Sequence, residues 1–239
     1  MGELLQKTDV VVGIDIGGTK TQVTVYDHRF QPLGTNRKKT VKPGKKAEDR
    51  LFKITDAALK DAGDPAIRGV GVGSPGPLDP NTGVVIDTPN LGWKDFPLAR
   101  KLEERYGVPV VLDNDVNVGT YGEWCFGEVK HCRNVLGIFP GTGIGGGIII
   151  DGKLLHGFSG AAGEIGHMTL QVDGPRCGCG KRGCLEALAS RVAIAKEAAA
   201  LAARADAPYL LEHYGTDLAR LKSGALAKSI AAGDVLVED

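Results

Sequence analysis

Two hairpin-like segments with the same layout constrain the fold of this chain more than any other feature. Residues 10–15 form an apolar run, residues 17–19 form a turn of glycine and threonine, and residues 21–26 alternate β-forming with polar side chains. Residues 137–151 repeat this layout around a second turn, Gly141-Thr142-Gly143. Each segment closes at an acidic turn residue, Asp27 in the first and Asp151 in the second. The repeat predicts two related α/β lobes, each with one glycine-rich turn.

Further helices and strands are predicted along the rest of the chain. Apolar residues at helical spacing predict helices over residues 47–62, 98–106, 116–126 and 223–232. Short apolar runs predict strands over residues 68–73, 108–112 and 135–139. The basic segment 37–46 indicates a solvated strand end and loop, and the alanine-rich segment 184–204 predicts one long helix. The pattern favours an α/β layered fold with lobes over residues 1–115 and 116–239.

Charge and hydropathy narrow the class of partner. The 29 basic and 29 acidic residues cancel, which removes the usual electrostatic reason to expect a nucleic acid or an anionic membrane. No apolar stretch approaches the ~20 residues needed to cross a bilayer, and the first nine residues lack the apolar core of a secretory signal. The 35 glycines, about twice the usual share, favour backbone held close to a ligand. We therefore expect a cytoplasmic protein with a small-molecule ligand.

The two glycine turns are candidate phosphate sites, since glycines expose backbone N–H groups to phosphate oxygens. The candidate residues are Asp15, Gly17, Gly18, Thr19 and Lys20 in the first turn and Gly141, Thr142 and Gly143 in the second. Asp15 could hold Mg²⁺ through water. The spacing differs from the Walker pattern, and either turn alone could be an ordinary hairpin. Two such turns in one chain favour a two-sided phosphate clamp.

A second candidate is the acidic run that follows the strand predicted over residues 108–112. Asp113, Asn114 and Asp115 open a helix, at a position where active-site carboxylates often lie in α/β sheets. One of these acids could simply be the helix N-cap. Alternatively, Asp115 could accept a proton from a substrate hydroxyl with Asn114 as a neutral partner.

The third candidate is a metal site of one histidine and three closely spaced cysteines. His167, Cys177, Cys179 and Cys184 make a complete tetrahedral zinc set, and a full protein shell leaves no place for a water nucleophile. The zinc would be structural, although the spacing alone also admits a redox or metal-free loop. Cys125 and Cys132 are expected to be free thiols in the packing.

Two glutamates lie close to the predicted metal loop in sequence. Glu164 lies three residues before His167, and Glu186 lies two after Cys184. Two acids and an imidazole edge held in this way suit recognition of sugar hydroxyls. Both glutamates could equally be solvated surface acids.

In these segments the chain resembles the ROK family of repressors, open-reading-frame proteins and sugar kinases, and within it the bacterial glucokinases. The resemblance is carried by six motifs along the chain: DIGGTK at 15–20, PNLGW at 89–93, NDVN at 114–117, GTGIGGG at 141–147, EIGH at 164–167 and CGCGKRGCLE at 177–186. It implies an actin-like, ribonuclease-H-type two-lobed fold that closes on a sugar and ATP. The lobe after residue 115 is expected to be incomplete, because nothing after Gly233 matches the helices and the glycine-rich strand with which family kinases continue.

The resemblance also implies roles for residues. It makes Asp115 the catalytic base, which takes the proton of the sugar's terminal hydroxyl, and it makes the two glycine turns the phosphate loops, with Mg²⁺. His167 would serve both zinc and sugar. The sugar ligands that it implies are Asn90, Asn114, Glu164, His167 and Glu186.

The implied activity is ATP-dependent phosphorylation of glucose to glucose 6-phosphate by a homodimer. The rival expectations are a kinase for fructose, mannose or N-acetylmannosamine, polyphosphate as the donor, and a sugar-binding module without catalysis. The repressor branch carries a DNA-binding helix-turn-helix before the first lobe. Because the first strand begins by Val10, we expect a kinase rather than a repressor.

Overall fold

The structure is a computed structural model that describes the chain except residues 1–5, 7–8, 42–45, 89 and 238–239. Its contacts divide it into two compact units. The first comprises Met1–Gly137 and Gly147–Ala162, and the second comprises Ile138–Gly146 and Gly163–Asp239. Each unit is described below by itself. The lobes predicted over residues 1–115 and 116–239 stay a prediction. The two units are defined by contacts within each of them, and this division does not test the lobe boundaries.

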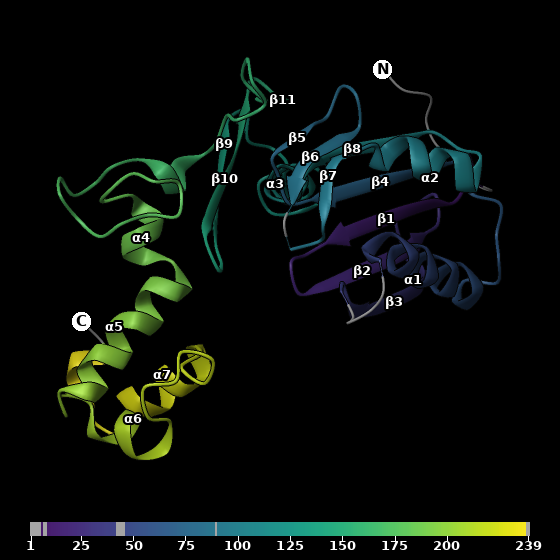
Figure 1. The fold of residues 1–239 in the computed structure, drawn as a ribbon. Coiled ribbons are helices and arrows are strands. Elements are labelled where there is room, and N and C mark those ends of the chain that lie inside the picture. The colour runs from purple at the N-terminus through teal and green to yellow at the C-terminus, as the bar shows by residue number, and fades with distance from the viewer. Residues whose placement is uncertain (1–5, 7–8, 42–45, 89, 238–239) are drawn as a thin grey trace. The chain divides into compact units, whose positions relative to one another are not determined.

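A five-stranded mixed sheet forms the centre of the first unit, with strand order β3-β2-β1-β4-β8 (Figure 1). Its strands are β1 (Val11–Ile16), β2 (Lys20–Tyr26), β3 (Pro32–Lys39), β4 (Gly69–Ser74) and β8 (Val110–Asn114). The hairpin predicted around the first glycine turn is confirmed, with Ile14 opposite Val23 in an antiparallel pair. β1 and β4 pair in parallel, as do β4 and β8. Because β1, β4 and β8 run parallel, their carboxyl ends lie together at one edge of the sheet.

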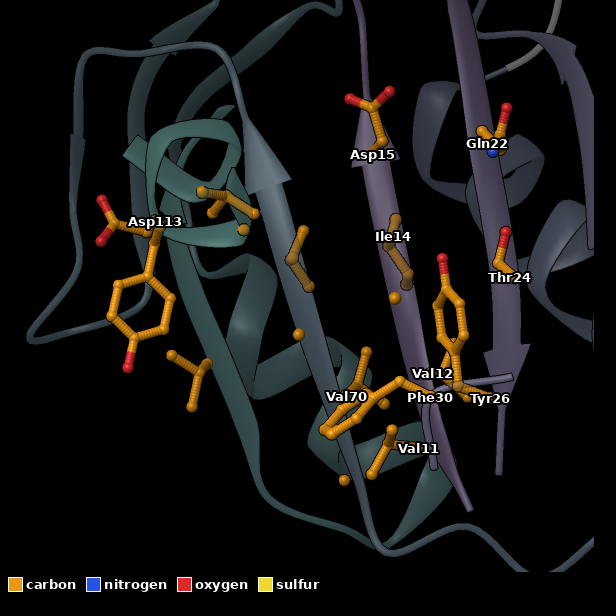
Figure 2. Close-up of a pocket in the computed structure, with 18 of the residues that line it drawn as sticks. Val11, Val12, Ile14, Asp15, Gln22, Thr24, Tyr26, Phe30, Val70 and Asp113 are labelled. Atoms are coloured by element: carbon orange, nitrogen blue, oxygen red, sulfur yellow. The ribbon is translucent and has the colours of Figure 1, made fainter. Parts of the chain in front are cut away.

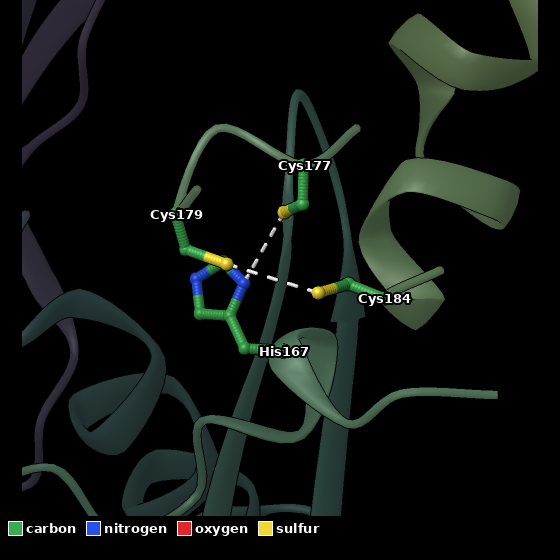
Figure 3. Close-up of side chains that lie close together, drawn as sticks. All are labelled: His167, Cys177, Cys179 and Cys184. Carbon is green, nitrogen blue, oxygen red and sulfur yellow. Dashed lines mark hydrogen bonds between the residues drawn. The ribbon is translucent and has the colours of Figure 1, made fainter. Parts of the chain in front are cut away.

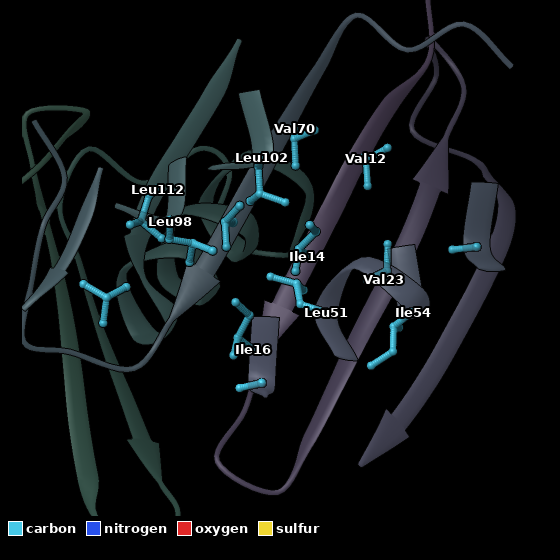
Figure 4. Packing of buried hydrophobic residues seen from close by; sticks show 14 of the residues in the cluster. Val12, Ile14, Ile16, Val23, Leu51, Ile54, Val70, Leu98, Leu102 and Leu112 are labelled. Atoms are coloured by element: carbon cyan, nitrogen blue, oxygen red, sulfur yellow. The ribbon is translucent and has the colours of Figure 1, made fainter. Parts of the chain in front are cut away.

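One face of this sheet is buried under two helices. Along β1 the side chains of Val12, Ile14 and Ile16 are buried, as the two-residue period of a strand requires. The covering helices are α1 (Ala47–Asp61) and α2 (Leu98–Tyr106), whose bounds match the predicted helices to within a residue. Figure 4 shows their buried leucines and isoleucine beside these strands. This cluster is the core of the first unit.

The close fit of α1 depends on a glycine in the neighbouring strand. A Cβ at Gly34 of β3 would lie 2.6 Å from the backbone nitrogen of Ala62 and 2.7 Å from the carbonyl oxygen of Ala58. Real Cβ atoms do not approach backbone atoms so closely, so only glycine lets the end of α1 pack on β3 here.

Helix α3 (Asp115–Phe126) follows β8 directly and packs near the end of β4. A Cβ at Gly73 of β4 would lie 3.4 Å from the Cα of Asp115 and 3.6 Å from the Cβ of Val118. Val72 points into the core, so Gly73 and α3 lie on the opposite face. The first turn of α3 is therefore held against the edge at which the parallel strands end.

One feature of the first unit was missed by the sequence patterns. A small antiparallel sheet of three short strands connects β4 to α2: β5 (Leu78–Asp79), β6 (Val84–Thr88) and β7 (Trp93–Phe96). These strands span two to five residues, too few for periodicity to stand out. Trp93 and Phe96 stack with ring centroids 4.6 Å apart.

The second predicted hairpin is also present. β9 (Val135–Pro140), β10 (Ile144–Ile150) and β11 (Lys153–Leu154) form a sheet in the order β11-β10-β9. The tip of this hairpin, Ile138–Gly146, belongs to the second unit, and its base belongs to the first. The hairpin thus contributes the glycine turn at residues 141–143 to the second unit.

Short helices make up most of the second unit. They are α4 (Leu185–Ala189), α5 (Arg191–Ala203), α6 (Pro208–His213), α7 (Ser223–Ala231) and the 3₁₀ turns η1 (Ile165–His167) and η2 (Val235–Val237). The single long helix predicted over 184–204 is wrong: the chain breaks at Ser190, which is extended with φ −69° and ψ 160°. Its side-chain oxygen accepts a hydrogen bond from the backbone N–H of Ala193 and caps α5. Among the described residues no helix combines the length and apolarity needed to span a membrane.

Candidate functional site

The metal-site candidate comes together in the second unit. η1 supplies His167, the loop after it supplies Cys177 and Cys179, and Cys184 lies just before α4. Their ligand atoms all lie within 4.8 Å of one another (Figure 3). The His167 Nδ1 lies 3.5 Å from the Cys177 Sγ, and the Sγ atoms of Cys179 and Cys184 lie 3.7 Å apart.

These separations fit a tetrahedral zinc ion. Zn–S bonds of about 2.3 Å and a Zn–N bond of about 2.0 Å place two sulfurs about 3.8 Å apart and a sulfur about 3.6 Å from a nitrogen. Both measured distances agree with these edges. The four side chains can therefore hold a metal ion, and they fill its coordination shell.

The two thiols that face each other differ in acidity. Burial, reinforced by hydrogen bonds with the other two cysteines, raises the pKa of Cys184 to about 11. The backbone N–H of Lys181 lowers the pKa of Cys179. Since a metal binds thiolate rather than thiol, metal binding at this cluster must release protons, and acid will oppose it.

Glu186 links the metal cluster to the second glycine turn. One oxygen of its carboxylate accepts a hydrogen bond from the backbone N–H of Ile144 at 3.0 Å, and the other accepts from the Cys177 thiol at 3.7 Å. A Cβ at Gly143 would clash with the same carboxylate. A side chain at residue 143 would therefore displace the Glu186 carboxylate from the turn, a contact that sequence reasoning did not anticipate.

The imidazole of His167 has two distinct edges. Its Nδ1 faces Cys177, and its Nε2 lies 3.8 Å from a carboxylate oxygen of Glu164. Glu164 is well exposed, with 59% of its side chain accessible. A metal on Nδ1 would fix the proton on Nε2 and leave an N–H donor beside an exposed carboxylate.

The second glycine turn lies at the start of α5. The backbone N–H of Gly141 donates to the carbonyl of Gly143 at 2.7 Å, and the backbone N–H of Arg191 donates to the carbonyl of Gly141 at 3.0 Å. Thr142 and Arg191 line one end of a cavity of about 530 Å³. Its other walls come from α5, α7 and the loop between α6 and α7: Val192, Ile194, Ala195, Leu218, Leu221, Lys222, Ser223, Leu226, Ala227 and Ile230. Sequence reasoning missed Arg191, because no local motif contains it.

In the first unit, the first glycine turn is braced by a neighbouring strand end. The Thr40 hydroxyl donates to the Gly17 carbonyl at 2.7 Å, and the Thr40 backbone N–H donates to the Thr19 carbonyl at 3.0 Å. Gly18, Thr19 and Lys20 are exposed. The turn is therefore held in shape while its tip faces solvent.

The junction of β8 and α3 carries the predicted base. The helix cap is Asn114 and not an acid: its Oδ1 accepts from the backbone N–H groups of Val116 and Asn117 at 2.9 and 3.3 Å. Burial and the charge of Asp15 raise the pKa of Asp115, against a lowering by the backbone N–H of Val116. Burial also raises the pKa of Asp15, while Arg37 lowers it.

The structure thus brings Asp15, Asn114 and Asp115 to one edge of the sheet in the first unit. Asn90 lies at an exposed turn between β6 and β7, where the Leu91 backbone N–H donates to the Thr88 carbonyl at 2.9 Å. In the second unit the glycine turn, Glu164, Glu186 and the metal cluster lie in one neighbourhood.

A second cavity, of about 630 Å³, lies on the face of the sheet that α3 partly covers, and Val118, Tyr121 and Phe126 of α3 line it (Figure 2). Its walls are mostly apolar, with Val11, Val70 and Phe30 on one side. Asp15 and Asp113 lie at its polar end.

Comparison with known proteins matches this fold and these motifs. The model of the family described as ROK matches residues 11–234. A glucokinase of Halalkalibacterium halodurans is 40% identical over 192 residues, which are 77% of this chain and 58% of that relative. A xylose repressor of Bacillus subtilis is 44% identical over 128 residues, 54% of this chain and 33% of that relative. The chain therefore spans less than two thirds of the curated relatives that it matches.

Solved structures agree. The crystal structure of a ROK family glucokinase from Streptomyces griseus, in complex with glucose and AMPPNP, superposes with a TM-score of 0.78 at 33% identity. The match covers 95% of this chain and 73% of that one. The class defined by fold and motifs is an α/β protein with the actin-like, ribonuclease-H-type fold of sugar kinases, as predicted. The chain belongs to the ROK family.

Proposed function

We propose that this chain catalyses transfer of the γ-phosphoryl group of ATP to the terminal hydroxyl of a hexose, with glucose as the substrate. Similarity to glucokinases supports this assignment at the level of sugar phosphorylation. Because the chain is also similar to a xylose repressor, the experiment below tests both the identity of the sugar and the turnover.

The observation that carries the proposal is the environment of Asp115. Its carboxylate lies at the start of α3, partly buried, and burial together with the nearby charge of Asp15 raises its pKa. A carboxylate whose ionised form is disfavoured in this way is a better proton acceptor than an ordinary aspartate. In the proposed reaction Asp115 takes the proton of the sugar hydroxyl while the hydroxyl oxygen attacks the γ-phosphorus in line. The bond from the γ-phosphorus to the β–γ bridging oxygen breaks, and ADP leaves.

We assign the nucleotide phosphates to the two glycine turns. Gly17 and Gly141 donate their N–H groups within the turns, so we assign the N–H groups of Gly18, Thr19, Thr142 and Gly143 to phosphate oxygens. The start of α5 adds positive potential beside Gly141. The cavity of about 530 Å³ next to Thr142 has the apolar walls that a purine base requires. Asp15 would hold Mg²⁺, which supplies neutralisation of phosphate charge when bound.

Sugar recognition is assigned to Asn90, Asn114, Glu164, His167 and Glu186. Support comes from the two edges of His167: zinc on Nδ1 leaves Nε2–H as a donor to a sugar hydroxyl, beside the Glu164 acceptor. The zinc would be structural, since His167, Cys177, Cys179 and Cys184 complete its shell. Five unpaired cysteines suit a reducing compartment such as the cytoplasm. The homodimer stays a proposal from the family resemblance.

An ADP-release assay with glucose, fructose, mannose and N-acetylmannosamine tests this function, with ATP and polyphosphate as alternative donors. We expect turnover with ATP and glucose. Asp115→Asn should lower kcat by at least about 100-fold, the usual contribution of a general base, while glucose affinity stays within about threefold. Near-normal turnover by Asp115→Asn would refute the role of Asp115.

The second candidate is a sugar-binding module without catalysis, which the similarity to a xylose repressor favours. If glucose raises the melting temperature but no sugar supports ADP release, this candidate replaces the kinase.

A further inference from the structure

A hydrogen-bonded pair of side chains, His156 and Asp113, lies next to the base, and the proposed mechanism does not use it. Asp113 is the fourth residue of β8, two positions before Asp115, and its side chain is only 16% exposed. The Nε2 of His156 lies 2.6 Å from its Oδ2. The two residues are 43 positions apart in sequence, and both belong to the first unit.

The other oxygen of Asp113 organises the junction of β8 and α3. Its Oδ1 accepts from the backbone N–H of Asn114 at 2.7 Å and from the Nδ2 of Asn117 at 3.0 Å. Asn117 is buried and lies in the first turn of α3. The carboxylate therefore ties together the residues on either side of Asp115, and His156 completes its set of donors.

His156 also belongs to a segment with its own fixed geometry. It follows β11, where the Leu155 backbone N–H donates to the Ile148 carbonyl at 2.8 Å. The His156 carbonyl accepts from the backbone N–H of Ala162 at 3.0 Å and closes the loop 156–162. Backbone hydrogen bonds thus hold the main chain on both sides of His156, so its imidazole is kept in position to contact the Asp113 carboxylate.

We propose that His156 is a positioning residue for the phosphoryl transfer: through Asp113 it fixes the turn that presents Asn114 and Asp115. The inference rests on the proposed function for its effect on turnover, and on the local contacts for its effect on the turn. Because a displacement of about 1 Å of a reacting group can cost 100-fold in rate, a lost anchor two residues from the base should be visible in kcat.

The test compares His156→Ala with His156→Gln, which keeps an N–H donor for Asp113, and with His131→Ala, an exposed histidine of the same unit, as the control. Hydrogen exchange of the amides of Val116 and Asn117 reports on the turn without requiring activity. We expect exchange about tenfold faster in His156→Ala, as when one charge-assisted hydrogen bond is lost, and close to wild type in the other two.

Turnover provides the second arm. His156→Ala should lower kcat by about 10- to 100-fold with KM for sugar within about threefold, and His156→Gln should recover most of the loss. If His156→Ala does not fold, Asp113→Asn takes its place, because it keeps the side-chain volume. We then expect the same increase in amide exchange and the same decrease in kcat as for His156→Ala.

The outcomes separate this inference from the proposed function. Unchanged exchange at Val116 and Asn117 overturns the positioning role, whatever the activity. If His156→Ala exchanges faster and the wild-type protein turns over no sugar, the positioning of the turn by His156 is upheld and the kinase function is refuted. Faster exchange with an unchanged kcat shows that the anchor is structural only and overturns its role in catalysis.

Discussion

At the scale of single residues, the two aspartates at the junction of β8 and α3 have opposite environments. Asp113 receives three hydrogen bonds, two of them from side chains, so its charge is well compensated. Asp115 is partly buried and lies near the charge of Asp15, so its pKa is raised, and the hydrogen bond from the backbone N–H of Val116 offsets this rise only in part. The Asp113 carboxylate therefore stabilises the fold, whereas the Asp115 carboxylate is destabilised in its ionised form and is the better proton acceptor.

This contrast predicts opposite effects of removing the two charges. The pKa of Asp115 is raised in the folded protein above the ordinary 3.8, so the folded form gains stability from the proton at low pH and loses it as pH rises through the raised pKa. Asp115→Asn should therefore be more stable than wild type at pH 7, and the difference should shrink toward pH 4. Urea denaturation without ligands at both pH values measures it.

Asp113→Asn is the matched control for that measurement. It weakens charge-assisted hydrogen bonds and should cost about 1–2 kcal/mol at pH 7. If Asp115→Asn is destabilised as much as Asp113→Asn, burial does not dominate the environment of Asp115.

At the scale of elements, the break between α4 and α5 shows how a single side chain divides a helix. Residues 184–204 carry alanine and leucine at helical spacing, and composition alone favours one helix. The buried Ser190 instead adopts an extended conformation and caps α5. The gain is that the first N–H of α5 reaches the carbonyl of Gly141. The break thus joins the helix to the glycine turn.

Removing the cap should therefore destabilise the second unit. Ser190→Ala is expected to lower the free energy of unfolding by about 1 kcal/mol, because the N–H of Ala193 loses its partner. Ser190→Thr keeps the hydroxyl and should recover most of that loss. Equal stability of wild type and Ser190→Ala in urea denaturation would show that the hydroxyl does not determine where α5 begins.

At the scale of the whole molecule, the metal cluster belongs to one unit only. A metal ion on His167 and the three cysteines would cross-link the loop between η1 and α4, a fully described segment (residues 168–184) that forms two isolated β-bridges but no helix or strand. The core of the first unit rests on packing between its sheet, α1 and α2. A structural metal should therefore stabilise the two units unequally.

Chelation of zinc should lower hydrogen-exchange protection over residues 163–190 and leave the strands β1, β2 and β4 unchanged. Elemental analysis of reduced protein should find about one zinc per chain. Cys184→Ala should reproduce the effect of the chelator, and Cys125→Ala, a cysteine outside the cluster, should not. Equal loss of protection in both units, or protein without zinc, would contradict a structural zinc site.

Much of what the sequence determined about this protein is local. The hairpin at residues 11–26, the helices α1 and α2 and the cluster of three cysteines were all predicted, because periodicity, glycine turns and ligand spacing act over a few residues. The ROK motifs likewise lie in continuous segments.

Only the tertiary structure decided the contacts between distant segments. The pairing of β1 with β4, the reach of Glu186 to the glycine turn and the pair of His156 with Asp113 join residues up to 58 positions apart. No short pattern encodes such pairs, because each depends on where two elements meet once their apolar faces are buried. The strands β5 to β7 escaped prediction because they span too few residues for a period to stand out, and the break at Ser190 did so because the surrounding alanines and leucines favour one continuous helix.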